Sequence, residues 1–375
     1  MEVVASGAFW DATRAPTNLR TASATSALRA SDGTLFATCR LGSDREGADG
    51  TTGVFASRDE GATWELRTLT LGEREWDGWI GETRGWYLSE LEPGVLTAAV
   101  LWTDRRDPDQ PWVDPVTQGL LGMRAYTLVS RDGGWTWPER RPIDLGGHDG
   151  ASTAGPVLRL ADGTLGVPFE TWKSHWDANP GVPAAYLRLS RDEGRTWDDE
   201  VLVARDPANR IYYWDERLET HPDDGRLVNM FWTHDAAAGQ DIDVHICWGS
   251  PDGREWTEPV STGFAGQHTQ PVSLGGDRLV ALSSHRGDPP GIRAVLSEDF
   301  GRTWDVAGAL TVYASDAGTE PGAGGPRTQA DYWNDMGQWQ FGHPRGARLP
   351  NGDVLVVFYG GSGVTRSARW ARLRI

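Results

Sequence analysis

One short phrase recurs along the chain, and its recurrence constrains the fold more than any other feature. The phrase reads Ser-x-Asp-x-Gly-x-Thr-Trp, and full copies occupy residues 57–64, 130–137, 190–197 and 297–304. A shortened variant occupies residues 250–256. Each copy follows a run of residues typical of a β-strand. Self-similarity at such a spacing is the sequence signature of a repeat architecture.

The residue types in the phrase indicate a hairpin turn with a packing anchor. Ser and Asp side chains accept hydrogen bonds from nearby backbone groups in tight turns. Gly adopts the positive φ angles that other residues resist. Thr and Trp favour the strand that follows, and the large Trp ring can fill a gap between neighbouring sheets. We therefore interpret the phrase as structural and not as catalytic.

A second repeat precedes each phrase as a turn between two apolar runs. These turns end in a glycine, at Gly33, Gly94, Gly163, Gly225, Gly276 and Gly352. A turn dipeptide between apolar runs is a strong hairpin signal. Two hairpins per unit and a period of about 50 to 75 residues match a propeller blade. The sequence predicts an all-β fold, a six-bladed β-propeller with four-stranded antiparallel blades, over residues 1–375 as one domain.

The two ends of the chain are predicted to meet in the sixth unit, which lacks the phrase. Its tail, residues 367–373, can supply a third strand. Residues 2–5 at the N-terminus can supply the fourth and close the ring.

Composition limits the classes of partner. The net charge of −17 disfavours nucleic acid and anionic membrane surfaces. No run of about 18 apolar residues predicts a membrane span, and no signal peptide is seen at the start, so we expect a cytoplasmic protein.

We expect Cys39 and Cys247 to be buried free thiols. No Cys/His spacing is typical of zinc, and no cofactor is expected.

The predicted topology separates the phrase from the place where a site would form. Both turns of each unit lie on one face, so the starts of the first strands and the loops between the second and third strands lie on the other. This second face is dense in Asp, Glu, His, Arg and Trp. Aromatic faces with polar tips suit a sugar, so we expect a small-molecule or glycan substrate.

With these features the chain resembles the sialidase (neuraminidase) superfamily, in which the phrase is known as the Asp-box. The resemblance implies an Arg triad for the substrate carboxylate, an Asp acid/base, and a Tyr nucleophile helped by a Glu. Carried onto this chain, it assigns the acid/base role to Asp44 or Asp49 and the Glu role to Glu216.

The chain departs from the family pattern at two positions. His343 stands where the resemblance places the Tyr, and we expect it to act as a general acid/base because histidine titrates near neutrality. The loop 231–235 lacks the second Arg of the triad, and Arg286 or Arg293 could supply the third. The expected substrate-binding residues are Arg20, Arg40, Trp102, Trp172, His234, His268, Arg286 and Arg345.

Three functions stay open from the sequence. The first is a sialidase-like exo-glycoside hydrolase that cleaves a terminal and possibly anionic sugar. The second is a propeller polysaccharide lyase or a His-dependent glycosidase acting on uronic-acid glycans, with proton chemistry from His343, His268 and Tyr87 or Tyr359. The third is a carbohydrate-binding propeller without catalytic activity.

Overall fold

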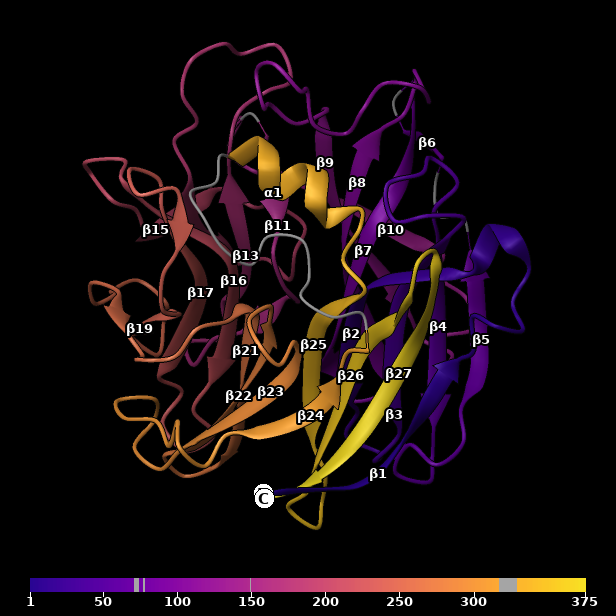
Figure 1. The fold of residues 1–375 in the computed structure, drawn as a ribbon, viewed down its shortest axis with the longest axis vertical. Coiled ribbons are helices and arrows are strands. Elements are labelled where there is room, and N and C mark those ends of the chain that lie inside the picture. Colours follow the sequence, from indigo (N-terminus) through magenta and orange to yellow (C-terminus); the bar gives the residue numbers. More distant parts are fainter. Residues whose placement is uncertain (71–73, 77, 149, 317–328) are drawn as a thin grey trace.

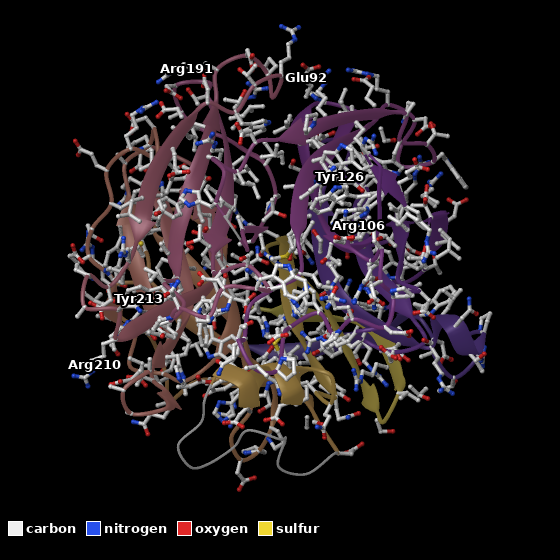
Figure 2. The ribbon with its side chains drawn as sticks, turned by 90° about the horizontal axis from the view of Figure 1, so that it is seen from above. Glu92, Arg106, Tyr126, Arg191, Arg210 and Tyr213 are labelled. Atoms are coloured by element: carbon white, nitrogen blue, oxygen red, sulfur yellow. The ribbon has the colours of Figure 1, made fainter. Side chains whose placement is uncertain are left out.

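The chain is built of β-strands whose sheets follow one another around a common centre, in a propeller arrangement (Figure 1). The computed structural model describes residues 1–70, 74–76, 78–148, 150–316 and 329–375. These residues contain one α-helix, α1 (Gln329–Met336), and one short 3-10 turn, η1 (Thr17–Leu19). Seen from above in Figure 2, Tyr126 and Tyr213 lie on opposite sides of the ring. Within the described residues, no helix combines the length and apolar character that a bilayer crossing requires.

The largest sheet has eight strands and contains both ends of the chain. A single parallel bridge, between Thr21 and Arg366, joins its two antiparallel groups. One group consists of β2 (Thr21–Arg29), β3 (Leu35–Gly42), β4 (Thr51–Ser57) and β5 (Glu65–Thr70). The other consists of β25 (Phe341–Arg348), β26 (Val354–Ser362), β27 (Thr365–Arg374) and β1 (Glu2–Trp10).

Four further antiparallel sheets follow in chain order. The first contains β6 (Glu75–Trp76), β7 (Trp79–Glu92), β8 (Val95–Asp104), β9 (Met123–Ser130) and β10 (Glu139–Ile143). The second contains β11 (Ser152–Thr153), β12 (Leu158–Arg159), β13 (Leu165–Thr171), β14 (Ala184–Ser190) and β15 (Asp199–Ala204). The third contains β16 (Ile211–Thr220), β17 (Leu227–Asp235), β18 (Gln240–Asp241), β19 (His245–Gly249) and β20 (Val260–Ser261). The fourth contains β21 (Gln267–Gly275), β22 (Arg278–His285), β23 (Gly291–Ser297) and β24 (Leu310–Ala314).

Neighbouring sheets pack face to face through apolar clusters. Phe36 of β3 and Val54 of β4, for example, share a buried cluster with Trp86 of β7 and Val100 of β8. Because inner strands are covered on both faces, every residue of β3 and β4 is buried, and their sequences are largely apolar or small. Cys39 and Cys247 lie buried and unpaired in β3 and β19, as the sequence predicts.

The repeated phrase forms the same Ser–Gly and Asp–Thr hydrogen bonds in its four full copies, and its Trp indole bonds the Gly carbonyl in the first and fourth. In the first, the Ser57 hydroxyl accepts from the Gly61 N–H at 2.9 Å, and the Asp59 carboxylate accepts from the Thr63 N–H at 2.8 Å. The Trp64 indole N–H donates to the Gly61 carbonyl at 2.8 Å. Gly61 has a φ of +91°, which a side chain would strain. The phrase is therefore a structural turn, as predicted.

The strand register places the phrase far from the connecting loops. Leu35 at the start of β3 pairs with Ser57, the first residue of the phrase, whereas Leu41 near the end of β3 pairs with Thr51. The loop after β3 therefore lies at the opposite end of the sheet from the phrase. We call these two ends the phrase end and the loop end.

The N-terminal strand closes the ring, as the sequence predicts, and it is longer than predicted. β1 pairs antiparallel with β27 from Glu2–Arg374 to Trp10–Ala368. Phe9 of β1 is buried against the ring of Phe55, with 5.1 Å between ring centroids. Pairing between β1 and β27 thus closes the propeller.

Deletion of residues 1–10 should lower the melting temperature by more than about 10 °C, because it removes a ladder partner of β27 and the buried Phe9. Differential scanning calorimetry measures this shift. The control is Glu2→Gln, which removes only the Glu2–Arg374 ion pair between two exposed side chains and should change the melting temperature little. Equal melting temperatures for the deletion and the parent would show that β1 does not close the ring.

Candidate functional site

A pocket of about 1090 Å³, counting the part open to solvent, lies at the loop end of the sheets. Aromatic side chains form much of its wall. They are Tyr87, Trp112, Trp172, Trp214, Trp232 and Tyr332. Polar and charged groups interrupt this aromatic wall.

A β-bulge recurs on the innermost strands. β2, β16, β21 and β25 each carry one more residue than the partner strand over the same stretch of ladder. The residue at this place has a left-handed backbone in all four strands, with φ between 47° and 50°. These residues are Ala24, Asp215, His268 and His343.

All four bulge residues line the pocket. A β-bulge interrupts the regular alternation of side chains and re-aims one of them. A left-handed conformation in a residue other than glycine costs about 1–2 kcal/mol and persists where surrounding structure enforces it. The bulges thus explain why Asp215, His268 and His343 face the centre of the ring.

Two carboxyl groups, Asp215 and Glu170, share the pocket wall. Asp215 Oδ1 accepts from the Arg217 guanidinium at 3.0 Å, and Asp215 Oδ2 lies 3.3 Å from His268 Nε2. Glu170, near the end of β13, accepts from the Glu216 N–H at 2.8 Å. Burial, with the nearby Asp215 carboxylate, raises the pKa of Glu170 to about 8. The wall therefore holds a protonated carboxyl group beside a carboxylate that is fixed by a cation.

Two arginines bind one carbonyl beneath this pair. Arg217 donates to the Ala154 carbonyl at 2.9 Å, and Arg345 donates to the same oxygen at 3.1 Å. Arg345 also hydrogen-bonds Tyr87, and burial lowers the pKa of Arg345 to about 9. These contacts join β7, β16 and β25 to the residue that follows β11. Side chains from different sheets are thereby held together below the pocket wall.

His268 and His343 pack against each other beside Asp215, with ring centroids 4.1 Å apart and ring planes tilted by 30°. Arg45 lies 3.5 Å from His343 Nε2. Burial is the largest cause that holds the pKa of both imidazoles well below the usual range, and the neighbouring Arg45 adds to it. The near-neutral titration expected for His343 is thus wrong. Both rings are therefore neutral at pH 7.

Glu82 organises the cationic side of the pocket. This fully buried carboxylate accepts from Arg40 at 2.8 Å, from Arg84 at 3.3 Å and from Arg105 at 2.9 Å. Although burial opposes ionisation, the three guanidinium groups lower the pKa of Glu82 to about 2. Glu46 adds a second carboxylate, 2.5 Å from Arg84.

The same arginines hold the loops that shape the pocket. Arg40 donates to the Asp44 carbonyl at 3.1 Å and to the Gly47 carbonyl at 2.5 Å. Arg105 donates to the Glu46 carbonyl at 2.8 Å. Arg40, Arg45 and Arg84 all reach the pocket wall. Glu82 therefore fixes both the positive groups of the pocket and the loop after β3.

α1 covers part of the pocket mouth. In Figure 1 it lies toward the loop end of the sheets, away from β1 and the C-terminus. Tyr332 and Met336 of this helix line the pocket, and Arg45 donates to the Met336 carbonyl. Tyr332 packs edge-on against Trp214 and Trp232. α1 therefore bounds the pocket along one side.

Four of the residues predicted from the sequence meet in this pocket. Arg40, Trp172, His268 and His343 all line it. Arg345 lies beside it, with its guanidinium carbon 5.0 Å from the centroid of the pocket residue Tyr87.

Other predicted residues lie outside the pocket wall and serve the surrounding structure. The Asp44 carboxylate accepts from the Gly47 N–H at 2.5 Å, and the Asp49 carboxylate accepts from the Ser43 N–H at 3.1 Å, so both brace the loop after β3. Glu216 is fully buried and accepts from the Asn229 amide at 2.6 Å. Burial raises the pKa of Glu216 well above its usual range.

The remaining predicted binders support neighbouring elements. Trp102 is fully buried in the cluster between the first two sheets of the chain. The His234 ring stacks on Trp214, and His234 Nδ1 lies 3.1 Å from Asp241 Oδ1. Arg286 donates to Gln267 at 3.0 Å and to the Phe341 carbonyl at 2.8 Å. The backbone carbonyl of Arg20, after η1, accepts from the Arg366 N–H at 2.9 Å.

Glu170 is not among the residues predicted from the sequence, which favoured Glu216 over its neighbour Asp215. The signal for Glu170 was a single charged residue at the end of an otherwise apolar strand, β13 (Leu165–Thr171). Among the described residues, no group of three or more His, Cys, Asp or Glu side chains is arranged to hold a metal ion.

Comparisons with known proteins show a shared fold. No family model matches the chain, and no curated protein matches it. A protein of unknown function from Dyadobacter fermentans is 19% identical with a TM-score of 0.75, over 100% of this chain and 99% of that chain. The Hadza microbial sialidase Hz136 is 17% identical with a TM-score of 0.70, over 99% and 68%. The Fusarium graminearum α-L-arabinofuranosidase Arb93A is 13% identical with a TM-score of 0.64, over 100% and 98%.

Glu82→Gln should destabilise the protein by about 3–5 kcal/mol, because three buried guanidinium groups lose their shared carboxylate. Urea unfolding at pH 7 measures the loss. Because the pKa of Glu82 is lowered to about 2, its contribution is complete above about pH 5 and disappears as the pH falls toward 2. The parent and the variant should therefore converge in stability at low pH.

The matched control is Asp104→Asn, which breaks a pair with the exposed Arg106 and should cost at most about 1 kcal/mol. A Glu82→Gln protein as stable as this control would show that Glu82 does not organise the site.

Proposed function

We propose that the protein is an exo-acting glycoside hydrolase that removes a terminal, anionic sugar from a glycan. The observation that carries the proposal is the carboxyl pair of the pocket. Glu170 is kept protonated near neutrality, and Asp215 is paired with Arg217 in the same wall. Two carboxyl groups in different protonation states are what most glycosidases use.

The geometry suggests a role for each group. Glu170, as the protonated acid, donates its proton to the oxygen that leaves with the rest of the glycan. Asp215 is the carboxylate that stabilises or attacks the sugar carbon from which that oxygen departs. Water then adds to this carbon, displacing Asp215 where it has attacked, and returns a proton to Glu170. Arg217 and His268 keep Asp215 in place, since they contact both of its oxygens. Preorganisation of this kind lowers the barrier because nothing has to reorient during the reaction.

The positive side of the pocket supports an anionic sugar. Arg40, Arg45 and Arg84 reach the wall, where they pair with Glu82 and Glu46. A guanidinium group binds a carboxylate in a bidentate fashion. The aromatic rings that line the rest of the wall can cover the apolar faces of a sugar ring.

We also propose that the fold is the six-bladed propeller of the sialidase superfamily and that the repeated phrase is its Asp-box. Separation of the eight-stranded sheet at its one parallel bridge leaves six antiparallel groups, including the four other sheets. Proteins named sialidase and arabinofuranosidase share this fold with the chain. Sialic acid and uronic acids are the first anionic sugars to test.

A second candidate is a lyase acting on a uronic-acid glycan. The close His268–His343 pair favours it, because neutral imidazoles beside arginines could remove a proton next to a uronate carboxylate. A lyase makes an unsaturated product that absorbs ultraviolet light, whereas a hydrolase does not. Digestion of uronic-acid polysaccharides, followed by absorbance, separates the two functions.

A panel of chromogenic glycosides, sialosides and uronides included, should reveal turnover. Glu170→Gln and Asp215→Asn should each lower kcat by about 10²- to 10⁴-fold, because each removes one partner of the carboxyl pair. Glu216→Gln is the matched control, since Gln replaces a buried carboxyl group of raised pKa with a group of similar shape. Loss of activity in Glu216→Gln with full activity in Asp215→Asn would transfer the role back to Glu216.

The pH profile gives an independent prediction. Because the pKa of Glu170 is raised to about 8, kcat/KM should fall as the pH rises through about 8 and the acid loses its proton. Initial rates on the best substrate of the panel, from pH 5 to pH 10, measure this limb. A flat profile through pH 9 would exclude Glu170 as the acid.

A further inference from the structure

The most exposed large apolar side chains of the described chain belong to two loops at the pocket. Val116 is 85% exposed, in the loop after β8, and Trp176 is 76% exposed, in the loop after β13. Large apolar side chains left in water usually mark a binding surface when they lie together.

A loop-to-loop hydrogen bond joins the segments that carry these two side chains. The hydroxyl of Thr117 donates to the carbonyl of His175 at 2.6 Å. Val116 directly precedes Thr117, and Trp176 directly follows His175. We call Val116 and Trp176 together the rim patch.

The loops that carry the rim patch are braced. The Leu120 N–H donates to the Lys173 carbonyl at 3.0 Å, and the Trp172 indole donates to the Gln118 carbonyl at 2.7 Å. His175 Nε2 lies 3.1 Å from the Pro111 carbonyl. The His175 ring packs edge-on against Trp176, with centroids 4.9 Å apart. An exposed indole on a braced loop binds with little loss of conformational entropy.

The rim patch continues the wall of the pocket. Trp112 and Leu120, from the loop after β8, line the pocket, and so does Trp172, four residues before Trp176. A glycan whose terminal sugar enters the pocket must leave it over the rim. Its next sugar units would meet the side chains that project there.

We propose that the rim patch is a second sugar subsite, in which Trp176 stacks on the sugar next to the terminal one. This inference rests on the proposed function, because it assigns the pocket to the terminal sugar. The ligand is a glycan of at least two or three sugar units, and the C–H face of its second sugar lies on the indole. Trp176 is thus a residue that sets preference for chain length.

The test uses binding, so that it does not depend on turnover. The Asp215→Asn protein is titrated by calorimetry with sialyllactose and with sialic acid, and in parallel with trigalacturonic acid and galacturonic acid. Addition of Trp176→Ala should weaken trisaccharide binding about tenfold, because part of a Trp side chain is no longer buried by the ligand. Monosaccharide binding should change less than about twofold.

The control is Trp135→Ala. Trp135 is 45% exposed, but it belongs to the repeated phrase at the phrase end, far from the pocket along the strands. Its removal should leave both affinities unchanged. Melting temperatures of all variants confirm that they fold.

The other possible results exclude either the second subsite alone or the proposed function with it. If the trisaccharide binds Trp176→Ala as well as its parent, or if both ligands weaken equally, the second subsite is excluded while the proposed function stands. If sedimentation shows a self-association that Trp176→Ala abolishes, the patch is a protein interface and the proposal fails. If no sugar binds any protein and the glycoside panel shows no turnover, the proposed function fails, and the subsite with it.

Discussion

The left-handed bulge on the innermost strands is the constraint on which the site depends. A regular strand alternates its side chains between the two faces of a sheet, and both faces are here covered by neighbouring sheets. The bulges at Asp215, His268 and His343 turn a side chain toward the pocket instead. The strain of three such residues amounts to about 1–2 kcal/mol each. A fold held by six large apolar clusters and closed by β1 can carry that cost.

The repeated phrase and the candidate site lie at opposite ends of the sheets. The phrase turns repeat the same Ser, Asp and Gly hydrogen bonds, and they hold each hairpin at the phrase end. The groups at the loop end do not repeat. Glu82 gathers three arginines on one side, and Arg217 and Arg345 bind the Ala154 carbonyl below the carboxyl pair. A repeating scaffold thus carries a pocket whose walls differ from sheet to sheet.

The all-β propeller arrangement was predictable from the sequence, whereas the identity of the carboxyl groups that face the pocket was not. The phrase and the glycine turns set hairpins at regular spacing, which is enough to place the loops and the pocket face. The bulge changes which residue faces the centre, and a shift of one position moves a side chain to the other face of a strand. For that reason Asp215, and not its neighbour Glu216, lines the pocket. Asp44 and Asp49 lie in the loop after β3, but their carboxylates accept hydrogen bonds from the backbone of that loop.

We propose that the bulges aim one carboxyl pair at a sugar in the loop-end pocket. A crystal structure of the Asp215→Asn protein with its glycan bound tests this most directly. We expect the terminal sugar between Glu170 and residue 215, with its anionic group toward Arg45. A sugar bound at the phrase end, or bound with residue 215 and Glu170 out of contact, would contradict it.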